Sequence, residues 1–289
     1  MGKRWVGWLA LAAGVAGLLW VAGAENRRML EARGGAAELS GASGEMPASV
    51  AVTTILLGGF RGLAADWLWM RADTLQEEGK YFELAQLSAW IARLQPRSPG
   101  IWGYHAWNMA YNLSAMAGDA DGKWRWVREG VRLLEEDGMR ECPGEAGVYR
   151  ELAWIFLHKM GGNDDAFAGE YRRRWGEEAR ARAAEGGGAV FGDAETVAEI
   201  GAAVPGVDWE TVQAASLYWA WKGLRVARRR GDDLALRRMV YQSVFQMIRD
   251  GRRDLVPAAE RLVRDTAARY PDNGALRGVL ERLDGVAGE

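Results

Sequence analysis

The chain has 289 residues, of which 49% are hydrophobic and 26% charged, and its formal net charge is only −2. This length provides enough material for a large hydrophobic core, and the near-zero charge argues against nucleic acid as a partner of the whole chain. The single cysteine, Cys142, excludes an intramolecular disulfide and a Cys-rich zinc motif.

The N-terminus carries a membrane signal. Lys3 and Arg4 precede the uncharged run "WVGWLALAAGVAGLLWVAGA", residues 5–24. Twenty helical residues span about 30 Å, the thickness of the hydrocarbon layer of a bilayer, so residues 1–24 are predicted to form a signal-anchor transmembrane helix. Ala22 and Ala24 also form an A-x-A cleavage pattern, and a cleaved signal peptide is the alternative. In both cases the body is expected on the periplasmic or extracytoplasmic side.

The rest of the chain is predicted to be all-α. Residues 25–48 are rich in Gly, Ala and Ser and predict a flexible tether. Turn signals such as "EEGKY", "CPGEAG" and "YPDNG" then separate segments of helical length, and no segment shows the alternation of a strand. We expect helical repeats over 49–185, a loose glycine- and alanine-rich insertion over 186–208, and C-terminal helical hairpins over 209–289.

A repeat register runs through the front half. A unit beginning at Pro99 has Trp102, Ala106 and Met109 at its fourth, eighth and eleventh positions. A unit beginning at Ala146 has Tyr149, Leu152, Ala153 and Phe156 at the fourth, seventh, eighth and eleventh. This spacing resembles the tetratricopeptide repeat, although 47 residues separate the two units where that repeat has 34, and His105 stands where Leu is usual. The resemblance implies a right-handed α-solenoid of helical hairpins.

A second resemblance concerns whole stretches. "GGFRGLAADWLWMRAD", "HAWNMAYN" and "LYWAWKGL" are similar to stretches of uncharacterised bacterial membrane-anchored helical-repeat proteins. This likeness implies a membrane-tethered scaffold and brings no established activity.

The register separates packing residues from binding residues. Trp102, His105, Ala106 and Met109 share one helix face, which is predicted to pack on the partner helix. In proteins of this resemblance, positions 2, 5, 9, 12 and 13 of each first helix line the concave face. Counted from Ala65, Pro99 and Ala146, these positions select as partner-binding residues Asp66, Trp69, Asp73, Gln76, Trp107, Tyr111, Arg150, Trp154 and His158.

The function predicted from these patterns is a scaffold that binds a protein or peptide on a concave aromatic surface, either by itself or as a subunit of a membrane complex. No metal-ligand spacing, nucleophile motif or cofactor fingerprint is present in the sequence, so no catalytic residue, metal or cofactor is predicted. The alternative is a membrane-proximal enzyme acting on a glycan. In it Asp66 and Asp73, about 10 Å apart along one helix face, would serve as the acid and base.

Overall fold

Helices are the only regular elements of the described residues, 48–276 and 278–279, in the computed structural model, and this confirms the prediction of an all-α protein. The predicted anchor at 5–24 and the tether up to residue 47 lie outside these residues. None of the helices in the described ranges is long and apolar enough to cross a membrane.

The chain divides into two compact units, residues 1–71 and 72–289. Helix α2 (Ala48–Glu77) begins in the first unit and ends in the second. Gly79 follows it with a φ of 69°, a left-handed conformation that glycine adopts without a steric cost and that ends a helix.

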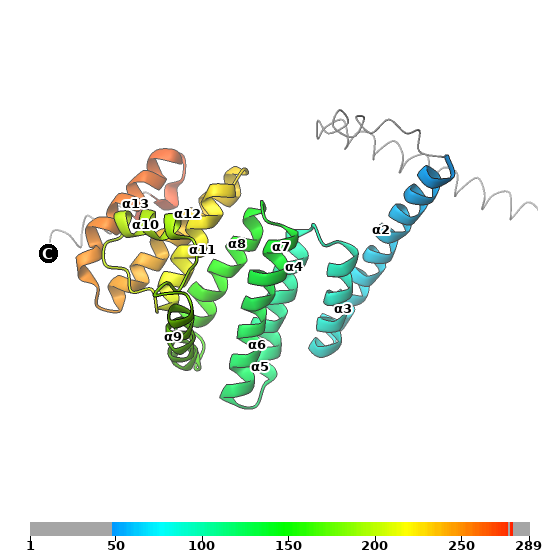
Figure 1. Ribbon diagram of the computed structural model, residues 1–289, viewed down its shortest axis with the longest axis horizontal. Coiled ribbons are helices and arrows are strands. Elements are labelled where there is room, and N and C mark those ends of the chain that lie inside the picture. Colours follow the sequence, from blue (N-terminus) through cyan, green and yellow to red (C-terminus); the bar gives the residue numbers. More distant parts are fainter. Residues whose placement is uncertain (1–47, 277, 280–289) are drawn as a thin grey trace, which may run out of the picture. The chain divides into compact units, whose positions relative to one another are not determined.

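The second unit continues with helices joined by short turns (Figure 1). Four α-helices are extended at one end by a different helical turn or a short α-helical piece, and the remainder are regular. In chain order the elements are α3 (Tyr81–Leu94), α4 (Pro99–Trp107), the π-helix η2 (Asn108–Leu113), α5 (Ser114–Met116), α6 (Ala120–Arg132), the π-helix η3 (Leu133–Gly138), α7 (Met139–Glu141), α8 (Ala146–Trp154), the π-helix η4 (Ile155–Met160), α9 (Ala168–Glu185), α10 (Ala194–Ala203), α11 (Val212–Val226), α12 (Arg230–Arg249), the 3-10 helix η5 (Arg253–Leu255) and α13 (Val256–Arg269).

Helices α4 and α6, together with the π-helices that extend them, pack closely on each other. Helix α6 lies against η2, and η3 lies against α4. The contact requires a glycine: a Cβ atom at Gly130 of α6 would lie 2.8 Å from the carbonyl oxygen of Ala106. Leu134 and Val127 on the same helical segment are fully buried. Small and apolar residues therefore let the two helix backbones approach each other.

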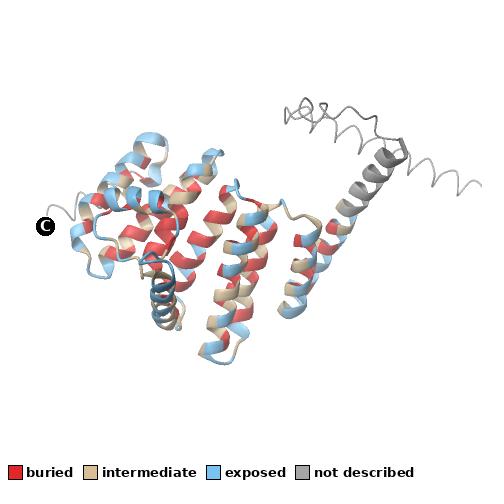
Figure 2. Cartoon of the chain, viewed as in Figure 1, coloured by how far each residue is buried: buried red, intermediate tan, exposed pale blue. Residues whose placement is uncertain are grey.

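Helix α11 forms the centre of the second unit. Residues 212–220 are all buried, which requires neighbours on every side of the helix, and α8 and α12 supply them (Figure 2). Buried polar bonds join the three helices. Ser216 of α11 donates to the carbonyl oxygen of Ala153 at 3.0 Å, and Gln246 of α12 donates to that of Leu157 at 2.9 Å.

The partner that packs along α8 is therefore α11, although α9 and α10 lie between them in the sequence. Helix α10 occupies part of the segment 186–208, for which the sequence predicted a loose insertion. Helix α9 lies against η4, α6 and α11.

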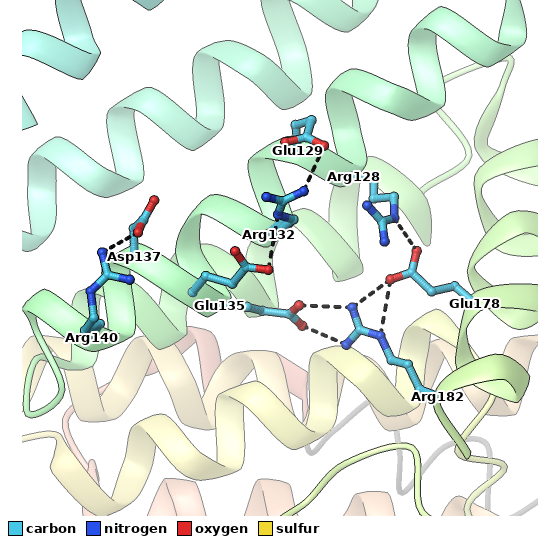
Figure 3. A network of polar contacts seen from close by, with 9 residues as sticks. Arg128, Glu129, Arg132, Glu135, Asp137, Arg140, Glu178 and Arg182 are labelled. Atoms are coloured by element: carbon cyan, nitrogen blue, oxygen red, sulfur yellow. Dashed lines mark hydrogen bonds and ion pairs between the residues drawn. The ribbon is translucent and has the colours of Figure 1, made fainter. Parts of the chain in front are cut away.

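An ion-pair network holds α9 in place (Figure 3). The guanidinium of Arg182 on α9 contacts Glu135 of η3 at 3.0 Å and Glu178 at 2.7 Å, and Arg128 of α6 contacts Glu178 at 2.8 Å. Burial raises the pKa of Glu135 above its ordinary value, and the Arg182 guanidinium opposes this rise. Partly buried carboxylates need such partners, so this network ties α9 to α6 and η3.

Candidate functional site

Three helices that are distant in sequence surround one cleft in the second unit. Its volume is about 400 Å³, within the range of about 300–1,000 Å³ that is usual for ligand pockets. Helices α4 and α8 provide most of its lining, and the start of α12 completes it. The lining residues are Pro99, Gly100, Gly103, Tyr104, Trp107, Glu145, Gly147, Arg150, Glu151, Arg229 and Asp232.

Glycines keep part of the cleft wall free of side chains. A Cβ atom at Gly100 would meet no atom within 4 Å, so the space beside this residue is open. At Gly103 a Cβ atom would lie 2.8 Å from Cγ of Glu151, which shows that the Glu151 side chain lies directly against α4. Pro99, at the first turn of α4, fixes the helix start without losing a helical hydrogen bond.

Charges of both signs line the cleft. Arg150 of α8 donates a hydrogen bond to Asp232 of α12 at 2.8 Å and to Glu151 at 3.3 Å. The bond to Asp232 joins two helices through residues that are 82 positions apart. Glu145 and Arg229, both exposed, form no ion pair with any residue of the described ranges. One carboxylate and one guanidinium are therefore available to a ligand.

An aromatic wall forms one side of the cleft. The Tyr104 hydroxyl donates a hydrogen bond to the side-chain oxygen of Gln76 at 2.7 Å. Burial raises the pKa of Tyr104, and the nearby Asp73 carboxylate raises it further, so the phenol stays protonated. One turn along α4, the Trp107 ring stacks on Tyr111 with 5.3 Å between ring centroids and an interplanar angle of 18°.

A second aromatic pair repeats the first one. Trp154 packs on His158 with ring centroids 3.9 Å apart, and the two pairs are related by the 47-residue spacing of the register. Both pairs stand where an α-helix passes into a π-helix, η2 after Trp107 and η4 after Trp154. The widened turn of a π-helix frequently marks a functional site.

The two pairs also approach each other. The Tyr111 hydroxyl is buried and makes no hydrogen bond of good geometry. Burial raises the pKa of Tyr111, and the neighbouring Trp154 indole, as a donor, opposes the rise. Burial lowers the pKa of His158, and the Asp164 carboxylate opposes this change. His158 is thus a mostly neutral ring beside Trp154 at neutral pH.

A buried lysine packs against the tyrosines of this aromatic region. The Lys159 side chain is 8% exposed, and its ammonium contacts the Asp165 carboxylate at 2.6 Å. The same ammonium lies 5.2 Å from the centre of the Tyr111 ring and 5.6 Å from that of Tyr171. Because its charge is neutralised internally, Lys159 holds the tyrosines in position and is closed to a ligand.

The residues predicted from the register fall into three groups. Trp107 and Arg150 line the cleft itself. Asp73 and Gln76 adjoin it through Tyr104, and Tyr111, Trp154 and His158 continue from Trp107. Asp66, which is exposed, and Trp69, which is half-buried, belong to the first unit.

Five cleft residues with polar side chains were missed by the sequence reasoning, among them Glu145, which precedes the first position of its unit and so lay outside the count. Tyr104 and Glu151 both stand at position 6 of their units, one helical turn after position 2, so counting i, i+4 neighbours would have found them. Arg229 and Asp232 had no sequence signal, because only the packing of α12 beside α8 brings them to the cleft.

The remaining candidates for chemistry are packed into the core. His105 is 4% exposed, and burial lowers its pKa to about 4. Cys142 is buried, its thiol contacts the carbonyl oxygen of Pro96 at 3.3 Å, and burial raises its pKa. In residues 48–276 and 278–279, no group of three or more His, Cys, Asp and Glu side chains is placed to hold a metal ion.

Comparison of the chain with protein-family models, with curated proteins and with solved structures finds no match. The geometry of the cleft is therefore the basis for a functional proposal.

Proposed function

We propose that the protein is a membrane-anchored helical-repeat scaffold that binds a protein or peptide segment in the cleft among α4, α8 and α12. The observation that carries the proposal is the cleft itself. It combines an open glycine wall, an aromatic wall, and two side chains of opposite charge, Glu145 and Arg229, that have no ion-pair partner among the described residues.

The arrangement of the helices supports a solenoid. Helices α4, α8 and α12 supply the cleft, while α6 packs behind α4, α11 behind α8 and α13 behind α12. Each pair would be one repeat, with α9 and α10 inserted into the second. In helical repeats of this kind the first helices line a concave surface that accepts an extended ligand.

The cleft chemistry favours a peptide over a small apolar molecule. A polypeptide presents charges of both signs, together with backbone amides that can contact the uncovered backbone at Gly100. The aromatic surface also extends beyond the cleft, from Trp107 through Tyr111 to Trp154, which is 38% exposed. A ligand longer than the cleft could therefore gain apolar contacts along this row.

The sequence supports the remaining part of the proposal. Residues 5–24 would anchor the body, which we place on the extracytoplasmic side of the membrane. A fixed subunit of a membrane complex is one form of the same proposal, with the cleft holding a permanent neighbour.

A cleft-filling variant tests the binding site. In Gly100→Phe the new ring would enter the cleft, because a Cβ atom at this position meets nothing within 4 Å. Gly169→Phe is the matched control. Gly169 is likewise exposed, is also the second residue of its helix and has no atom within 4 Å of a Cβ, but it does not line the cleft.

The measurement is a pull-down of the three full-length proteins from solubilised membranes, quantified by mass spectrometry. We expect the wild type and Gly169→Phe to retain the same stoichiometric partner, and Gly100→Phe to lose it. Equal retention by Gly100→Phe would show that the cleft is not the binding site. A wild-type protein that purifies without a partner and degrades a glycan would contradict the scaffold and favour the hydrolase alternative.

A further inference from the structure

Helix α2 is apolar on two opposite sides in the first unit. Ala65 and Leu68 are buried. On the other side Leu63, Trp67 and Met70 are 67%, 62% and 65% exposed. At 100° per residue these three side chains fall within about 60° of each other around the helix axis, and we call them the exposed apolar stripe.

The stripe is large for a surface that faces only water. Its three side chains expose on the order of 400 Å², which is in the size range of apolar patches that serve a function. Two exposed charged residues, Asp66 and Arg71, flank it on either side of the helix. In the sequence, the preceding part of α2, residues 48–60, contains no charged residue. The apolar character therefore begins at the start of the helix.

A second copy of the chain is a poor occupant for the stripe. A stable protein–protein interface buries about 800 Å² on each partner, roughly twice what the stripe offers. A bilayer surface needs no such complementary area, and Trp is the residue that favours the boundary between lipid headgroups and acyl chains.

The position of α2 in the chain also favours lipid. Only residues 25–47 separate the predicted membrane span from Ala48, where α2 begins. Twenty-three residues span at most about 80 Å even when fully extended. The start of α2 can therefore be no farther than this from the membrane whenever residues 5–24 are inserted.

We infer that α2 lies on the bilayer surface, with Leu63, Trp67 and Met70 in the headgroup region. Because the stripe runs parallel to the helix axis, this contact places α2 in the plane of the membrane rather than across it. The inference rests on the membrane anchor of the proposed function. It adds a second membrane contact, which orients the first unit.

Site-directed spin labelling tests the contact in the full-length protein. The background variant is Cys142→Ser, which keeps a donor for the Pro96 carbonyl oxygen. Single cysteines are introduced by Leu63→Cys, Trp67→Cys and Met70→Cys, and Ala268→Cys on the exposed surface of α13 is the control. Each protein is labelled with a nitroxide and reconstituted into vesicles of phosphatidylcholine and phosphatidylglycerol. The collision rates with oxygen and with a water-soluble nickel chelate are then measured.

We expect the three stripe positions to collide at least about threefold more with oxygen relative to the nickel chelate than position 268 does, because oxygen concentrates in lipid. If the stripe labels collide with the nickel chelate as often as the control label does, the stripe lies in water and the inference is overturned. Labels protected from both reagents would show that protein covers the stripe, and this would overturn it as well.

An alkaline carbonate wash separates this result from the anchor. A chain that stays in the vesicles while its stripe labels report water refutes only the contact of α2. A chain released by the wash refutes the anchor, and the inference fails with it.

Discussion

Truncation of two tryptophans, one in each of the two repeat units, tests the division between packing and binding faces. Trp102→Ala removes an indole that is 8% exposed and that donates a hydrogen bond to the Pro96 carbonyl oxygen at 2.7 Å. Trp154→Ala removes an indole that is 38% exposed and packs mainly on His158. The first residue belongs to the face that packs on other helices, and the second to the aromatic row beside the cleft.

The structure sets different costs for the two changes. Removal of Trp102 leaves a closed cavity, and large-to-small changes of this kind cost about 3–5 kcal/mol. The Pro96 carbonyl oxygen keeps its contact with the Cys142 thiol, so no further polar penalty is added. Removal of Trp154 opens to solvent and loses only part of a full burial energy of about 1.5–3 kcal/mol, which gives about 1–2 kcal/mol. The two variants should therefore differ by about 2–3 kcal/mol.

The assay is thermal unfolding followed by circular dichroism in one detergent, together with the pull-down. For a chain of this size 1 kcal/mol shifts Tm by about 2–4 °C, so Trp102→Ala should melt roughly 4–12 °C below Trp154→Ala. Trp154→Ala should instead weaken partner retention by about 2 kcal/mol or more, as expected of a hot spot. If Trp154→Ala melted as early as Trp102→Ala, the assignment of faces would be wrong.

Three further predictions concern the stability of the folded chain. Acidification from neutral pH to about pH 5 should cost about 2 kcal/mol of stability, because His105 takes up a proton near its ordinary pKa of 6.5 when unfolded but only near 4 when folded. His105→Leu should remove most of this loss in urea unfolding at the two pH values, with the remainder due to His158, whose pKa is also lowered by burial. An unchanged loss would assign it to another group. Gly130→Ala should lower the free energy of unfolding by about 1–2 kcal/mol, because its methyl group meets a carbonyl oxygen of α4. Gly169→Ala, with open space, should raise it by up to about 1 kcal/mol, and equal effects of the two would refute the close contact. Arg182→Met should cost about 1–3 kcal/mol at neutral pH and less in acid, where Glu135 can take up a proton; a cost that does not depend on pH would contradict the network.

Much of the helical organisation could be predicted from local patterns. Helical periodicity and turn residues are properties of short segments, so the all-α class follows from the sequence alone. The 47-residue register was also readable, and in the structure Trp107 and Trp154 both stand at the same point, the last residue before a π-helix. The π-helices themselves had no sequence signal that we recognised.

The cleft was only partly predictable. Trp107 and Arg150 were selected by their register positions, and both line it. The same counting selected Asp66 and Trp69, which belong to the first unit, because a register assigns faces to helices without fixing the placement of units. Position 6, which contributes Tyr104 and Glu151, was left out of the count.

The sequence by itself determined the all-α class, because helical periodicity and turn signals depend on neighbours a few residues away. It did not indicate α10, which lies in the segment predicted as a loose insertion. Only the tertiary structure decided which helix packs beside which. The partner of α8 is α11, beyond two intervening helices, and a Cβ atom at Gly223 of α11 would lie 2.9 Å from both Leu236 and Tyr149. That close packing brings α12 beside α8, so that Asp232 can reach Arg150 and close the cleft. Such pairing depends on how side chains from distant segments fit together, and no local pattern contains that information.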